Sequence, residues 1–156
     1  MKQLLKLILI GILSGLLLAG FLKLVYKITG NQAYILLYNI DYIPFLRQWE
    51  DVSAVGLVFH FVFCIASVIG LYYILKAFRH ERHPLPYLAV YTIGSGILYF
   101  LTLLTDQPPA ADDVAAWFYW TFGHVLFGFA VGYLVKYAMG MPWSRKSENE
   151  IRQQPS

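Results

Sequence analysis

Three ionisable side chains lie inside long apolar stretches of this chain, where they could do chemistry: Lys23, His60 and His124. Ionisable groups at membrane depth are costly and usually face the interior of a helix bundle. Histidine titrates between about pH 5 and 8, and its neutral ring can also ligate a metal or a haem iron. These residues are therefore candidates for proton response, ligand binding or cofactor ligation.

The apolar stretches themselves identify a membrane protein. Of the 156 residues, 58% are hydrophobic and only 13% are charged, whereas soluble domains average about 25% charged residues. Residues 52–75, 83–105 and 114–135 contain no Asp, Glu, Lys or Arg, and each run is long enough to cross a bilayer as a helix. A fourth run, residues 7–22, is shorter, but the lysines that flank it can extend their ammonium groups outward.

The pattern predicts an all-α integral membrane fold, a bundle of four transmembrane helices at residues 4–26, 54–77, 86–105 and 115–138. We expect a single domain over residues 1–143 and a polar tail at 144–156, whose composition is typical of disorder. The first segment begins like a signal peptide, but no small-x-small cleavage site follows it. We therefore expect it to remain as the first helix.

Basic residues predict the orientation of these helices, because Lys and Arg collect on the cytoplasmic side of membranes. The loop between segments three and four has no base and carries three acids. Bases instead gather before segment one, between segments two and three, and after segment four: Lys2, Lys6, Lys76, Arg79, Arg82, Lys136, Arg145, Lys146 and Arg152. Both termini are predicted to be cytoplasmic. The bases form no continuous face with interleaved aromatics, so no nucleic-acid partner is expected.

Helical spacing places the polar residues of each segment on one face. With a rise of 1.5 Å per residue, the ionisable residues and their polar neighbours all fall in the outer half of the membrane. We therefore predict an outward-facing pocket for a ligand or a proton, formed by His60, His124, Lys23, Tyr99, Thr102 and Thr121. The alternative is that each histidine is a packing residue, bonded to a hydroxyl or carbonyl of the next helix.

Small residues are predicted to bring the helices close together. Gly11 and Gly15 form a small-xxx-small pattern, and Gly128 and Gly132 form a second one. The partner of the first pattern is expected to be another segment of this chain; a homodimer or another membrane protein is the alternative. The only cysteine, Cys64, is expected to pack as a small hydrophobe.

The loop after the first helix is too apolar to float in water. Tyr34, Tyr38, Tyr42 and Trp49 suit the headgroup region of a membrane. This pattern predicts an amphipathic helix on the outer interface that stops at Pro44. An apolar cap over the mouth of the bundle is the second interpretation, and both can hold.

Several segments resemble the YagU-like family of bacterial inner-membrane proteins. The resemblance runs through residues 11–15 with Lys23 following, through residues 57–63 around His60, and through residues 120–126 around His124. It covers about two thirds of the chain. The first outer loop is shorter than expected for that family. The resemblance implies location in the bacterial cytoplasmic membrane, four helices, and family-like positions for Lys23, His60 and His124. It implies no reaction.

The leading hypothesis is a non-enzymatic protein whose His/Lys pocket responds to protons or binds a small polar or anionic ligand. No cofactor or metal is expected, and no nucleophile–base pair with an orienting acid can be named. One alternative is a redox protein in which His60 and His124 ligate a haem b. The others are a scaffold or accessory subunit of a larger membrane complex and a small transporter.

Overall fold

The computed structural model describes residues 2–41, 43–46, 48 and 53–140. The elements follow in the order α1 (Lys2–Thr29), the 3₁₀ helix η1 (Gln32–Leu37), α2 (Ser53–Ala77), α3 (Pro84–Leu98), the 3₁₀ helix η3 (Tyr99–Leu104) and α4 (Val114–Gly140). Within these described residues, four stretches are long and apolar enough to cross a membrane: α1, α2, α3 continued by η3, and α4. The chain is a small polytopic all-helical protein, and the four predicted spans are confirmed to within a few residues.

Local chemistry explains where the helices begin and end. Gly30 adopts a φ of 72°, and its N–H donates to the Tyr26 carbonyl at 2.9 Å, which is the left-handed cap that ends many helices. Pro84 opens α3, where its missing N–H costs nothing. The Oδ1 of Asp113 accepts the N–H of Ala116 at 2.9 Å and caps the start of α4. The third span differs from the prediction in its last turns, which tighten into η3.

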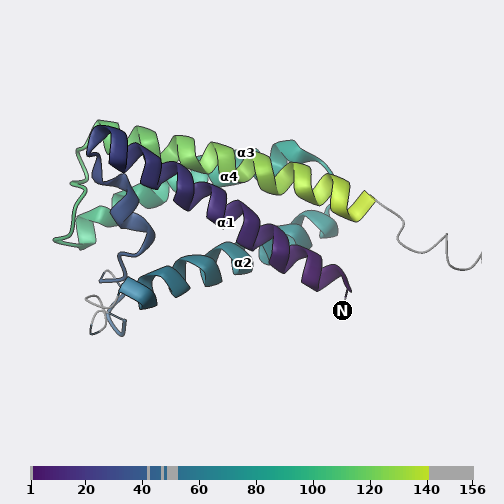
Figure 1. Cartoon of the computed structure of the whole chain (residues 1–156). Coiled ribbons are helices and arrows are strands. Elements are labelled where there is room, and N and C mark those ends of the chain that lie inside the picture. Colours follow the sequence, from purple (N-terminus) through teal and green to yellow (C-terminus); the bar gives the residue numbers. More distant parts are fainter. Residues whose placement is uncertain (1, 42, 47, 49–52, 141–156) are drawn as a thin grey trace, which may run out of the picture.

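The helices pack as a chain of neighbours. Helix α3 packs along α4, α4 against α1, and α1 against α2. Figure 1 shows α1 crossing between α4 and α2. Among the described residues, α2 and α3 make hardly any direct contact, although only a short loop joins them. The bundle therefore has one side on which two consecutive helices stand apart.

Glycines allow the close approaches within this arrangement. A Cβ atom on Gly11 would lie 2.8 Å from the Cα of Ile65, and one on Gly132 would lie 2.9 Å from the Cα of Pro84. Gly15 likewise meets Cys64 and Phe61 of α2, and Gly128 meets Leu88 of α3. Both small-residue patterns are thus occupied by helices of the same chain. A homodimer remains a prediction, and it would have to form through a helix face other than these two glycine patterns.

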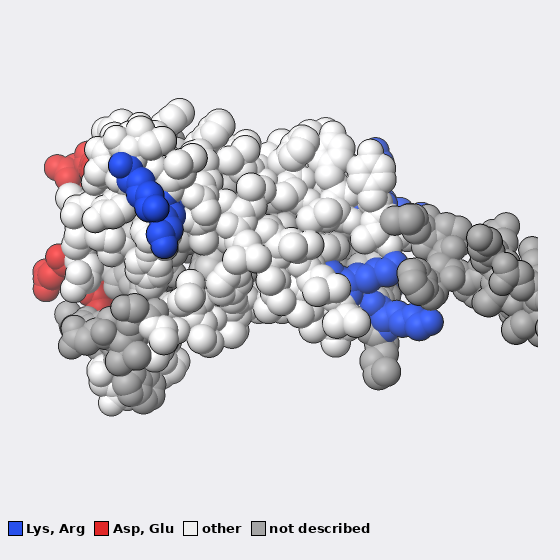
Figure 2. Space-filling model, viewed as in Figure 1, with Lys and Arg blue, Asp and Glu red and all other residues white. Residues whose placement is uncertain are grey.

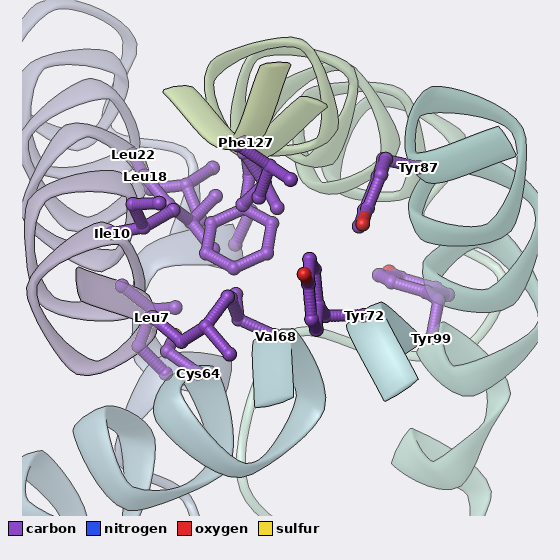
Figure 3. Packing of buried hydrophobic residues seen from close by; sticks show 14 of the residues in the cluster. Leu7, Ile10, Leu18, Leu22, Cys64, Val68, Tyr72, Tyr87, Tyr99 and Phe127 are labelled. Atoms are coloured by element: carbon purple, nitrogen blue, oxygen red, sulfur yellow. The ribbon is translucent and has the colours of Figure 1, made fainter. Parts of the chain in front are cut away.

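The core lies where α1, α2 and α4 meet. Figure 3 shows Leu18 and Leu22 of α1 beside the ring of Phe127 on α4, with Val68 of α2 on the other side of that ring. All four side chains are at least 98% buried. Most other large apolar side chains of the four spans face outward and are exposed, as lipid contact requires.

Charged residues separate to the two ends of the bundle. Figure 2 shows acidic side chains at one end and most basic side chains at the other, with an uncharged surface between them. We call these the acidic end (Asp41, Asp106, Asp112 and Asp113) and the basic end (Lys2, Lys6, Lys76, Arg79, Arg82 and Lys136). Lys23 and Lys27 of α1 lie toward the acidic end, and Glu81 lies in the loop between α2 and α3 at the basic end. The separation agrees with the loop charges from which the orientation is predicted.

The segment between α1 and α2 closes the acidic end, and we call its described residues 31–41 and 43–46 the cap. Ala33, Leu37 and Ile40 are almost fully buried. Gly56 of α2 passes directly against Tyr38, with no room for a side chain. The cap interpretation therefore holds, while the expected helix ends at Leu37, well before Pro44. Tyr42, Trp49 and the predicted tail lie outside the described residues.

Candidate functional site

A cavity of about 440 Å³ lies between α2, α3 and α4, beneath the cap. Its wall is mainly apolar, and its polar side chains include both membrane histidines, His60 and His124. Known ligand pockets have volumes of roughly 300–1,000 Å³, apolar walls and a few placed polar groups. The cavity has these properties, so it is the candidate functional site.

Two sides of the cavity are closed. At the acidic end, Leu36, Leu37 and Ile43 of the cap form part of its wall. Toward the basic end, the hydroxyl of Tyr91 on α3 donates to the Oγ of Ser67 on α2 at 3.5 Å, and both residues line the cavity. This long hydrogen bond joins the two helices that otherwise stand apart.

The third side opens toward lipid. Phe63 of α2 and Val90 and Leu98 of α3 line the cavity, yet they are 55%, 48% and 45% exposed. They therefore form the rim of an opening between α2 and α3. The rim belongs to stretches that are long and apolar enough to span a membrane.

His60 connects α2 to α1. Its side chain is 7% exposed, and its Nε2 lies 3.4 Å from the carbonyl oxygen of Gly15. The Sγ of Cys64, one turn further along α2, lies 3.7 Å from the same nitrogen. The contact to Gly15 is long for an N–H···O bond, but it directs Nε2 at the backbone of α1. His60 therefore has a packing role in addition to lining the cavity.

His124 is bonded within its own helix. Its Nδ1 lies 2.8 Å from the carbonyl oxygen of Trp120, and the centroids of the two rings are 4.4 Å apart with their planes tilted by 50°. The ring centroid of Phe127 lies 6.3 Å from that of His124. The second nitrogen, Nε2, has no hydrogen-bond partner among the described residues. His124 thus brings an unused polar atom to an apolar cavity.

Lys23 is not part of this cavity. Its side chain is exposed, and its Nζ lies 6.0 Å from the ring centroid of Tyr34 in the cap, which is within range of a cation–π contact. Burial raises the pKa of Tyr34, so the ring under this ammonium is neutral at physiological pH. The structure places Lys23 on the outside of the cap, away from the two histidines.

The remaining predicted residues divide between the cavity and the helix contacts. Thr102 lines the cavity. The buried hydroxyl of Tyr99 lies 2.8 Å from the Ala110 carbonyl and 3.1 Å from that of Asp113, so it holds the loop before α4. Thr121 faces Gly96 across the contact between α3 and α4. The hydroxyls of Thr102 and Thr121 are buried and have no partner among the described residues.

Sequence reasoning missed a polar cluster that holds the cap in place. The Nδ2 of Asn39 donates to the Oγ1 of Thr105 at 3.0 Å, and Thr105 donates to the Oδ2 of Asp41 at 2.5 Å. Asn39 and Asp41 are 6% and 5% exposed. The available signal was the presence of Asn39 and Asp41 within an otherwise apolar loop.

The directions in which the histidine ring nitrogens point can be compared with what haem ligation would need. Both histidines line one cavity, as two axial ligands would need. However, the Nε2 of His60 is directed at Gly15, so haem ligation through that nitrogen would require the ring to turn away from α1. The described residues contain no group of three or more His, Cys, Asp or Glu that could hold a metal ion.

Three comparisons with known proteins found nothing similar to this chain. No family model, no curated protein and no solved structure matches this chain. The resemblance to the YagU-like family therefore remains a prediction from the quoted residues, and the function is argued from the cavity itself.

Proposed function

We propose that this protein is a non-enzymatic membrane protein that binds a small lipid-soluble ligand in the cavity between α2, α3 and α4. The cap and the Tyr91–Ser67 bond close the cavity at its ends, while the gap between α2 and α3 opens it to the membrane. That lateral opening into an apolar cavity is the single observation that carries the proposal.

The ligand differs in character from the one expected from the sequence. The sequence predicts a polar or anionic ligand, because it places Lys23 beside the histidines. The cavity wall is instead mainly apolar, and Lys23 contacts Tyr34 outside it. Burying an unpaired anion in such surroundings is costly. An apolar ligand with few polar groups suits this wall.

Charge supports a location and an orientation for the same proposal. We place the protein in the bacterial cytoplasmic membrane with the basic end in the cytoplasm, following the rule that Lys and Arg favour that side. The cap then lies on the outer side. In this orientation the cavity, which the cap partly lines, lies toward the outer side.

A fluorescence titration tests whether the cavity binds ligand. Trp120 lines the cavity, so a variant in which Trp49, Trp117 and Trp143 are replaced by Phe has its only indole there. In phosphatidylcholine vesicles, a linear bromoalkane that enters the cavity quenches Trp120 with a saturable dependence on its mole fraction. Quenching by collision in the lipid alone gives no saturation.

Two glycine substitutions provide the matched pair for this titration. A Cβ on Gly94 meets nothing within 4 Å, and Gly94 lines the cavity, so Gly94→Leu fills part of it. Gly70 is equally open but lies exposed on α2 outside the cavity. We expect Gly94→Leu to abolish the saturable quenching and Gly70→Leu to preserve it. Equal behaviour of the two variants would contradict the proposal.

A further inference from the structure

We infer that the ligand of this cavity carries a hydroxyl group, as a lipid-soluble alcohol or phenol does, and that it donates this hydrogen to the Nε2 of His124. The inference rests on the proposed function, because it assumes that the cavity binds a ligand. It adds the chemical class of that ligand and the atom that recognises it.

The hydrogen bond to Trp120 determines which nitrogen of His124 carries the hydrogen. A backbone carbonyl oxygen can only accept, so at 2.8 Å the Nδ1 of His124 must be the donor. A neutral imidazole has one N–H, and its other nitrogen is then an acceptor. The described residues of the cavity wall include no Asp or Glu, so they offer no carboxylate to pair with a charged ring. The Nε2 of His124 therefore presents a lone pair.

The other polar groups of the wall are mostly satisfied within the protein. Ser95 donates to the carbonyl of Thr92 at 3.0 Å, and Ser67 donates to that of Cys64 at the same distance. His60 is directed at Gly15. Besides the Nε2 of His124, the hydroxyl of Thr102 lacks a partner among the described residues that line the cavity. In the described part of the chain, the Nδ1 of His60 has only the Sγ of Cys64, at 3.9 Å.

An acceptor in an apolar site selects a donor. A ligand hydroxyl placed against Nε2 forms a hydrogen bond that water in the cavity would otherwise have to supply. An ether or ketone of the same shape brings only lone pairs and leaves Nε2 unpaired, which costs free energy in apolar surroundings. The cavity should therefore prefer an alcohol to its methyl ether.

The experiment is a competition in the Trp120 vesicle assay described above, with the linear bromoalkane as reporter. Dodecanol and dodecyl methyl ether are added as unlabelled competitors, each measured as its mole fraction in the bilayer. We expect dodecanol to displace the bromoalkane at a mole fraction about 2- to 10-fold lower than the ether, the range given by one neutral hydrogen bond. The two competitors share one alkyl chain, so the ratio isolates the hydroxyl.

Three variants assign the preference to an atom. His124→Phe keeps a ring beside Trp120 but removes Nε2, and we expect the alcohol-to-ether ratio to fall to about one. His60→Phe and Thr102→Val change the other histidine and the other unpartnered hydroxyl, and we expect both to retain the preference. Loss of the preference in Thr102→Val with retention in His124→Phe would overturn the assignment to His124.

The outcomes separate this inference from the proposed function. Equal displacement by alcohol and ether in the protein with native His124 refutes the hydroxyl inference, while saturable quenching that Gly94→Leu removes still supports a binding cavity. Absence of saturable quenching refutes both. Since the ratio is measured first with every cavity residue unchanged, the inference stays testable even where His124→Phe fails to fold.

Discussion

The Nδ1 of His124 lies 2.8 Å from the carbonyl oxygen of Trp120, and the two rings contact each other at a tilt of 50°, one helical turn apart on α4. This single turn therefore supplies both an aromatic part of the cavity wall and its acceptor atom. His60, at the same cavity, instead directs Nε2 at Gly15 of α1. Two histidines that look equivalent in sequence thus have different surroundings: one ring bonds within its own helix, and the other is directed at a neighbouring helix.

Gly11 gives a test of the α1–α2 contact. We expect Gly11→Ala to lower the free energy of unfolding by about 1 to 3 kcal/mol, because its Cβ would lie 2.8 Å from the backbone of Ile65. Gly20 on the same helix has nothing within 4 Å, so Gly20→Ala should be neutral or stabilising. Unfolding in mixed micelles, followed by circular dichroism, measures both. Equal free energies of unfolding would contradict the close approach of α1 and α2.

Thr105 gives a test of the cap. Thr105→Val removes the hydroxyl that bonds the buried Asn39 and Asp41, at a cost of about 1–3 kcal/mol for each buried group left unpaired. We expect the cap to open and acrylamide in the aqueous phase to quench Trp120 more strongly. Thr102→Val is the matched control, because that hydroxyl has no partner to lose among the described residues. Identical acrylamide quenching in the two variants would mean that the cluster does not hold the cap.

Lys23 should not contribute to ligand binding. Its ammonium lies over Tyr34 outside the cavity, so we expect Lys23→Ala to leave the saturable quenching of Trp120 by the bromoalkane unchanged. Any change in the stability of the cap appears separately, in acrylamide quenching. A loss of bromoalkane binding with an intact cap would restore Lys23 to the site.

The haem alternative has a direct spectroscopic test. Because His60 directs Nε2 at Gly15, we expect the protein, purified in detergent from cells supplied with haem precursor, to show no Soret band. A Soret band that disappears in both His60→Ala and His124→Ala would show that the rings turn to ligate iron. The protein would then be a redox protein, contrary to the ligand-binding proposal.

The four spans were predictable because hydrocarbon thickness and helical rise fix their length, and charge-free runs mark their position. The helical faces were predictable in the same way, so the shared cavity of His60 and His124 could be anticipated. The direction of a side chain at the end of a helix could not be predicted from the sequence. Lys23 shares a face with Gly15 in the sequence pattern, but its long chain leaves the bundle and contacts Tyr34.

The cap shows a second limit of the sequence. Tyr34 and Tyr38 fit an interfacial helix and a cap equally well. Burial in the membrane interface and burial against the bundle both require aromatic and apolar residues. What distinguishes them is the non-local bonding of Asn39 and Asp41 to Thr105, which depends on where α3 and η3 end. The gap between α2 and α3 is likewise a property of how four helices pack, and no periodicity within one helix encodes it.

The most direct test of the binding cavity compares two tryptophans on one helix. Trp120 lines the cavity, whereas Trp117, about one turn earlier on α4, is 37% exposed and is not part of its wall. Bromoalkane quenching is measured in vesicles with each as the only tryptophan. The cavity predicts saturable quenching of Trp120 and a non-saturating dependence for Trp117. The same non-saturating dependence for both would contradict an intramembrane binding site.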